Sequence, residues 1–218
     1  MTAAVLVAMV AGAEALRWWL RGRTLVAATG AWLLMALVAA GVSGDVGAWG
    51  AVALGAGSAG WLVLRWRAGA DIAMGALVIV AGLLLLADGG PDRSAAIIAG
   101  LGIAVLLSRT ANEVCRAVLD RARSLPEDDA PAPEQAPSAS HLRGGRIIGP
   151  LERWLIVALA LVGAEGVVVG LMAAKGIGRF PEISGDRGRG SAAEEFLVGS
   201  LVSWALAGAG ALMLAVLR

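Results

Sequence analysis

Charged side chains interrupt an apolar stretch in the last third of this sequence. Glu165 lies within a run of about 24 mostly apolar residues from Leu151 to Ala174, and Lys175, the only lysine, directly follows that run. An ionised side chain inside a membrane costs roughly 3 kcal/mol or more unless it is paired or hydrated, so each such residue is a candidate functional group.

Glycines surround Glu165 at positions 163, 166 and 170, and small residues allow helices in a membrane to pack closely. A helix that starts at Leu151 would place Glu165 about 21 Å along its axis, past the bilayer midplane. We therefore expect this carboxyl at a helix contact or in a polar cavity. There it could bind a cation, relay a proton or donate a hydrogen bond while protonated.

A second group of charges precedes this run. Pro150 is typical of the first turn of a helix, where the carboxylate of Glu152 would be favoured by the helix dipole. This interpretation gives Glu152 a structural role, with Arg153 beside it. Arg143 and Arg146 are expected at a cytoplasmic flank, where they could hold a lipid phosphate.

A third group follows the run. Lys175 suits the C-terminus of a helix, but that does not explain Arg179, Phe180 and Glu182 on a glycine-rich segment. These charges could form a salt-bridged plug, bind a lipid headgroup or line a pathway. Glu194 suits the first turn of the helix that follows.

Signals for an enzyme are weak. The sequence has no nucleophile–base pairing, phosphate-binding loop or metal-ligand cluster, and Cys115 and His141 are the only cysteine and histidine. We expect no catalytic residue, no metal and no cofactor. The net charge of +1 gives no indication of nucleic-acid binding.

The elements that must position these residues are long apolar helices. Hydrophobic residues make up 58% of the chain, charged residues only 16%, and the mean hydropathy is +0.77. The apolar runs have about the length that crosses a hydrocarbon core of about 30 Å. The sequence predicts an all-α transmembrane bundle of seven helices, five plus two: Thr2–Leu16, Thr24–Val42, Ala48–Leu64, Ala70–Ala87, Pro91–Leu107, Leu151–Ala174 and Ala193–Leu217.

Three further expectations concern the first five helices. Glu14 can pair with Arg17 three residues later. The Gly- and Ala-rich helix 48–64 is expected at the centre of the bundle. The fifth helix continues beyond Leu107 without a breaker, either as a solvated extension or bent onto the membrane surface.

Four prolines among polar residues mark a flexible linker. The predicted organisation is a five-helix region with its helix extension (1–124), the linker (125–141), and a two-helix hairpin with a charged loop (142–218).

Seven alternating crossings distribute the basic residues unequally. Arg93, Lys175, Arg179, Arg187 and Arg189 fall on one side, and the remaining 13 of the 18 fall on the other. The positive-inside rule makes the richer side cytoplasmic. We expect a multi-pass protein of the bacterial inner membrane with its N-terminus outside and its C-terminus in the cytoplasm.

A longer motif runs through roughly the last 75 residues: Gly145–Arg146, Ile148–Gly149, Leu151–Arg153, Ala174–Lys175, Arg179–Phe180, Glu182, Ala193–Glu194, Phe196–Ser200 and Ser203. In these residues the chain resembles a bacterial and phage family of polytopic membrane proteins of unknown function, whose pattern reads GRxIGxLER…AKxxxRFxE…AExFLxGxLxS. The family usually has glutamine where this chain has Glu165. The resemblance implies a shared hairpin and no particular activity.

Two functions fit these observations, in different classes. The preferred one is a transporter or channel-like protein, with Glu165, Lys175, Arg179 and Glu194 along a polar path. The alternative is a structural or assembly subunit whose charged hairpin binds anionic lipid, a second copy of the chain or another membrane protein. The two differ in whether a water-accessible cavity reaches Glu165 or a buried network closes without a path.

Overall fold

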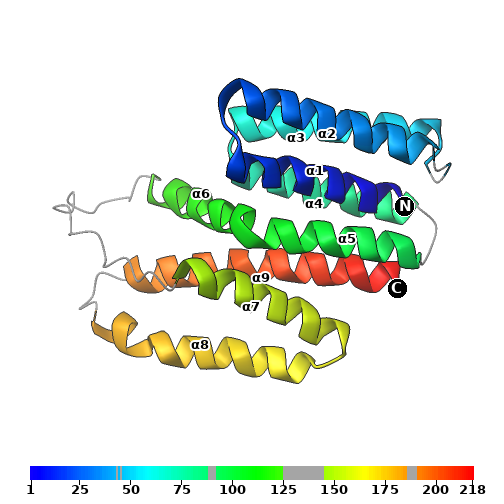
Figure 1. Cartoon of the computed structure of the whole chain (residues 1–218). Coiled ribbons are helices and arrows are strands. Elements are labelled where there is room, and N and C mark those ends of the chain that lie inside the picture. Colours follow the sequence, from blue (N-terminus) through cyan, green and yellow to red (C-terminus); the bar gives the residue numbers. More distant parts are fainter. Residues whose placement is uncertain (43, 45, 88–91, 125–144, 186–190) are drawn as a thin grey trace.

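The computed structural model describes residues 1–42, 44, 46–87, 92–124, 145–185 and 191–218; the side chains of 145–146, 179–185 and 191–192 are not included. The described chain is all-helical, as predicted (Figure 1). Its elements are α1 (Thr2–Trp19), α2 (Gly22–Val42), α3 (Ala48–Arg67), α4 (Ala70–Ala87), α5 (Arg93–Val105), η1 (Leu106–Thr110), α6 (Ala111–Arg123), α7 (Gly145–Leu161), α8 (Glu165–Gly185) and α9 (Ser191–Leu217).

Five helices of the described part are long and apolar enough to cross a membrane: α1, α2, α4, the continuous α5–η1–α6 helix, and α9 from Ala193 to Leu217. This finding supports a membrane protein in general. These five correspond to five of the seven predicted spans; the predicted spans 48–64 and 151–174 are not among them. In α3, glycine, tryptophan and arginine lower the hydropathy, and α7 has only 17 residues.

The most buried helix is α1, which contacts α2, α3, α4, α5 and η1 (Figure 1). Ten of its 18 residues are buried, whereas α3 buries only Leu54, Ser58 and Trp61. The prediction of a central α3 was therefore wrong. One close approach of two helix backbones uses a glycine on another helix: a Cβ at Gly102 of α5 would lie 3.2 Å from the Ala8 backbone of α1.

The fifth helix continues past Leu107 as predicted, but η1 interrupts its regular geometry. η1 is a π-helical turn in which Ser108 has φ −78° and ψ −106°, outside the helical region. Such a turn disturbs the regular backbone ladder and leaves carbonyl groups available to other donors. The Ser108 hydroxyl donates to the Ala104 carbonyl at 2.8 Å, and the indole N–H of Trp154 in α7 donates to the same carbonyl at 3.1 Å. Arg153 of α7 donates to the Leu107 and Ser108 carbonyls.

The predicted helix 151–174 is wrong, because the chain turns back in its middle. α7 ends at Leu161 and α8 begins at Glu165. Gly163 adopts φ +73°, its N–H donates to the Ala160 carbonyl at 3.2 Å, and the Ala164 N–H donates to the Leu159 carbonyl at 2.9 Å. This is a Schellman helix end with glycine in the left-handed position that it favours. The glycine thus ends a helix instead of packing two helices together.

Other boundaries change with this turn. α7 begins at Gly145, so Pro150 and Glu152 lie inside the helix and not in its first turn. α8 continues through Gly185, so Lys175 lies in the middle of a helix and not at its end. The predicted linker 125–141, with His141, lies outside the described residues.

The turn also places both chain termini at one end of the bundle, where seven crossings would have separated them (Figure 1). The Asp92 N–H at the start of α5 donates to the Leu217 carbonyl at 3.0 Å, and Arg218 donates to the Leu161 carbonyl at 2.6 Å. We call the opposite end, where α1 and α6 finish and α4, α7 and α9 start, the arginine-rich end.

Among the 15 basic residues of the described ranges, only Arg93 and Arg218 lie at the termini end. The other 13 lie at or toward the arginine-rich end, and they now include Lys175 and Arg179, because α8 runs back toward it. The antiparallel α7–α8 pair therefore brings to the arginine-rich end two basic residues that a single helix 151–174 would have placed at the opposite end.

Candidate functional site

Arg153 of α7 is the most deeply buried charged side chain of the C-terminal helices, with 1% of its surface exposed. Its Nε donates to the Leu107 carbonyl at 2.7 Å, and its NH2 group donates to the Ser108 carbonyl at 3.1 Å. The guanidinium also donates to Asn112 Oδ1 at 2.6 Å and to Ser203 Oγ at 3.0 Å. One arginine thus joins α7 to η1, α6 and α9.

Within the described ranges, no carboxylate forms an ion pair with Arg153. Its charge is solvated by two backbone carbonyls, an amide oxygen and a hydroxyl. The carbonyl of Leu107 and that of Ser108, whose backbone is non-helical, lie in the π-helical turn, so the irregular backbone and the buried arginine complement each other. Gly149 makes room for this arrangement, since a Cβ there would lie 3.1 Å from Asn112 Oδ1.

The neighbouring residue Glu152 forms a separate ion pair on α8. Lys175 Nζ lies 2.6 Å from Glu152 Oε2, and Trp204 of α9 donates its indole N–H to Glu152 Oε1 at 3.0 Å. The Lys175 ammonium also lies 5.6 Å from the centre of the Trp204 ring, a cation–π distance. Glu152 is 8% exposed. We call the residues of these contacts the hairpin cluster: Glu152, Arg153, Lys175, Asn112, Ser203 and Trp204.

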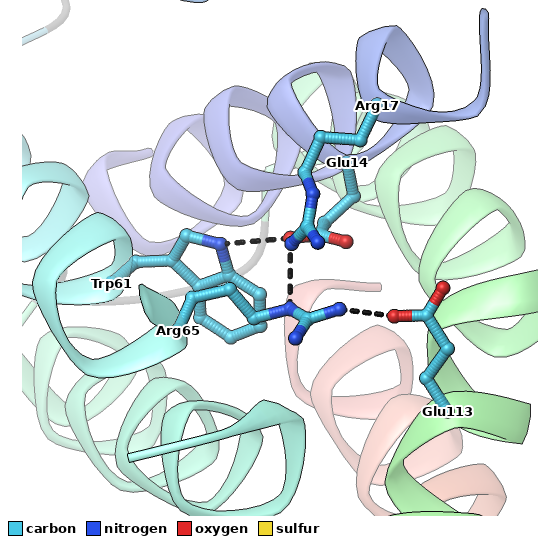
Figure 2. Close-up of polar contacts among 5 residues, drawn as sticks. All are labelled: Glu14, Arg17, Trp61, Arg65 and Glu113. Carbon is cyan, nitrogen blue, oxygen red and sulfur yellow. Dashed lines mark hydrogen bonds and ion pairs between the residues drawn. The ribbon is translucent and has the colours of Figure 1, made fainter. Parts of the chain in front are cut away.

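A second buried centre lies among the N-terminal helices (Figure 2). Glu14 of α1, 1% exposed, accepts a hydrogen bond from Trp61 at 3.2 Å and pairs with Arg17 at 3.1 Å and with Arg65 Nε at 3.4 Å. Arg65 also pairs with Glu113 of α6, as Figure 2 shows. The predicted Glu14–Arg17 pair is confirmed, and it is one part of this five-residue Glu14 cluster.

The structure brings only some of the predicted candidates together. Glu152, Arg153 and Lys175 meet in the hairpin cluster. Glu165 lies exposed in the first turn of α8, and among the described residues it forms no hydrogen bond or ion pair. The described contacts of the α9 start involve Glu195, which pairs with Arg123 at 2.8 Å, while Glu194 is exposed in the first turn.

Five other candidates cannot be placed at the level of side chains. Arg143 lies outside the described residues, and for Arg146, Arg179, Phe180 and Glu182 the description covers the helix backbone only.

Sequence reasoning missed Asn112, Ser203 and Trp204, which complete the hairpin cluster, and Trp61, Arg65 and Glu113 of the Glu14 cluster. Asn112, Ser203 and Trp204 lie at or next to apolar helix segments, where a polar atom needs a partner, and this signal alone could have marked them as contact residues. Their partners depend on helix packing, which spacing along the chain does not reveal.

The described part of the chain contains three cavities near these helices. Two are apolar, about 160 and 350 Å³, one among α1, α4, α5 and α9 and the other among α1, α3 and α4. The third, about 680 Å³, is polar and lies at the arginine-rich end, between α1, α6 and α7. None of the three is lined by Glu165, Glu152 or Lys175. Within the described ranges, no three His, Cys, Asp or Glu side chains group as metal ligands.

Comparison with known proteins returns no match: no protein-family model, curated protein or solved structure is significantly similar to this chain. The functional argument therefore rests on the geometry above.

Proposed function

We propose that this chain is a multi-pass protein of the bacterial inner membrane with its arginine-rich end in the cytoplasm. The positive-inside rule supports this orientation, since 13 of the 15 basic residues in the described ranges lie toward that end. In this orientation both termini lie outside, a change from the cytoplasmic C-terminus that seven crossings imply.

We further propose that the protein is a structural or assembly subunit. The observation that carries this proposal is the burial and internal pairing of the hairpin cluster: Arg153 is 1% and Glu152 8% exposed, and the two side chains bond to residues of η1, α6, α8 and α9. Buried charges paired in this way fix helices relative to one another. A transport site, by contrast, needs groups that a solute or water can reach.

The transport hypothesis depends on Glu165 in a polar path. Its position at the start of α8 favours a simpler role, since a carboxylate in the first turn stabilises a helix by about 0.3–1 kcal/mol through the dipole. The other proposed path residues do not converge on it in the described part of the chain.

The hairpin's outer helix, α8, is the surface that we propose for the assembly role. In the described part it has few contacts with the other helices, among them the Lys175–Glu152 pair, while Val167, Val169 and Ile177 are more than half exposed. Such a face suits lipid or the helix of a membrane partner, which includes a second copy of this chain.

Cysteine accessibility tests this proposal. In a Cys115→Ala background, Ser203→Cys places one thiol beside Arg153, and a membrane-impermeant maleimide is applied to either side of oriented vesicles. Arg21→Cys and Val162→Cys are the matched controls for the two ends. We expect Arg21→Cys to react only from the cytoplasmic side, Val162→Cys only from the outside, and Ser203→Cys from neither.

Labelling of Ser203→Cys from the side of Val162 would reveal a water path and restore the transport hypothesis. If Val162→Cys reacted from neither side, the α7–α8 turn would not reach the surface and the proposed crossing pattern would fail.

A further inference from the structure

The polar cavity at the arginine-rich end has the composition of an anion site. It measures about 680 Å³ and lies where α1 ends, between η1 with α6 and the start of α7. Four arginines line it: Arg17 from the last turn of α1, Arg21 from the connection that follows α1, and Arg109 and Arg116 from η1 and α6. Two helices far apart in sequence thus present their basic residues to the same space.

Among the described residues, the charges that line this cavity are not neutralised by one another. Glu113 is the only described carboxylate in its lining, and Glu113 pairs with Arg65, which lies outside the lining. Arg17 pairs with Glu14. Arg21, Arg109 and Arg116 form no ion pair within the described ranges, so the local net charge is +3 whether or not the Glu14–Arg65 neighbours are included.

Other lining residues locate the cavity at the level of lipid headgroups. The Arg109 guanidinium lies 5.3 Å from the centre of the Trp18 ring, which holds it at the end of α1. Trp19, next in the chain, is 83% exposed, and tryptophans of this kind are typical of the membrane–water interface. Ile147 of α7, 65% exposed, adds an apolar wall beside the arginines.

We propose that this cavity binds the phosphate of an anionic phospholipid. Guanidinium groups bind phosphate oxygens with paired, charge-assisted hydrogen bonds, and basic pockets between helices on the cytoplasmic side of membranes hold such headgroups. The interfacial tryptophans and Ile147 favour a lipid over a free anion. This site goes beyond the assembly role, because it is lined by α1, η1, α6 and the start of α7 and does not involve α8, although it shares Asn112 with the hairpin cluster.

The test is lipid binding to the full chain by native mass spectrometry and by competition in nanodiscs, with phosphatidylglycerol as the probe and phosphatidylcholine as the neutral reference. The test variant is Arg109→Gln with Arg116→Gln. The control variant, Arg23→Gln with Arg67→Gln, removes the same charge from the same end but outside the cavity lining. Unfolding temperatures of both variants are measured alongside, and Arg109→Lys with Arg116→Lys retains the charge.

We expect the test variant to lose phosphatidylglycerol affinity by about 30-fold, since each lost hydrogen-bonded contact to the phosphate costs roughly fivefold. The control variant is expected to lose far less, and the lysine variant to retain most of the binding. An equal loss in the control would mean general surface attraction and would overturn the site. Displacement of the lipid by millimolar inorganic phosphate would assign the cavity to a free anion and overturn the lipid assignment.

Discussion

The two buried polar centres stabilise opposite charges by different means. In the Glu14 cluster a carboxylate is surrounded by two arginines and an indole N–H, so its partners carry the opposite charge (Figure 2). In the hairpin cluster a guanidinium is surrounded by backbone carbonyls, an amide and a hydroxyl, and the only described ion pair there belongs to its neighbour Glu152.

This difference shows two ways to keep a charge among apolar helices. Opposite charges lower the cost of burial through Coulomb attraction, and such a pair can be broken one member at a time. Backbone carbonyls supply only partial charges, but they cannot be removed by mutation and they require an irregular helix at the right position. The π-helical turn η1 supplies this irregular helix, and Arg153 donates to its free carbonyls.

The largest expected effect comes from Arg153→Met. Methionine fills similar volume but leaves the Leu107 and Ser108 carbonyls, Asn112 and Ser203 without their donor. We expect the free energy of unfolding to fall by about 3–5 kcal/mol, as for other buried charges whose partners are left unsatisfied. Denaturant titration in mixed micelles measures it, with the exposed Arg116→Met as the control. A loss below about 1 kcal/mol would show that η1 finds other donors and that the contrast between the clusters is unfounded.

A smaller effect is expected in the Glu14 cluster from Glu14→Gln. Glutamine can still accept from Trp61, Arg65 keeps its pair with Glu113, and Arg17 is already partly exposed, so no partner is left wholly without compensation. We expect a loss of about 1–2 kcal/mol by the same titration. A loss equal to that of Arg153→Met would mean that the remaining contacts in the Glu14 cluster do not reduce the cost of removing the Glu14 charge.

The two centres differ in how much of them the sequence predicts, because spacing along one helix reveals a pair and does not reveal contacts between helices. The Glu14–Arg17 pair was predictable because both residues lie on one helix at a spacing of three, and apolar runs located the first five helices correctly. Partners such as Arg65 and Trp61 come from another helix, and no spacing rule connects them to Glu14.

The α7–α8 hairpin was harder to predict, because the glycine that ends α7 fits two interpretations. Gly163 between apolar residues is compatible with close helix packing or with a helix end, and the apolar run on both sides favoured one continuous helix. The acidic residue two positions later is an N-terminal signal that supports the second interpretation. Once the turn was missed, the positions of Glu165 and Lys175 within their helices were wrong together. The η1 turn carries no recognisable local signal, since its Leu, Ser, Arg and Thr residues occur in ordinary helices.

The smallest effect is expected at a charge that belongs to neither cluster. Asp92 caps α5 at the termini end: its carboxylate accepts from the Ser94 hydroxyl at 2.6 Å and from the backbone N–H groups of Ser94 and Ala95 at 2.9 and 3.3 Å. These hydrogen bonds, that from the Ser94 side chain above all, hold the pKa of Asp92 below its ordinary value of 3.8.

Because the pKa of Asp92 is lower in the folded chain than in the unfolded one, the capping contribution is complete above pH 3.8 and is lost as the pH falls through the folded value. Asparagine caps helices about as well without titrating, so Asp92→Asn should resemble the parent at neutral pH and lack this acid-dependent loss. Unfolding temperatures of the two chains between neutral pH and the acid limit measure the difference. A pH dependence identical in both would show that the acid sensitivity of α5 arises elsewhere, and the two buried clusters would then be the groups to titrate next.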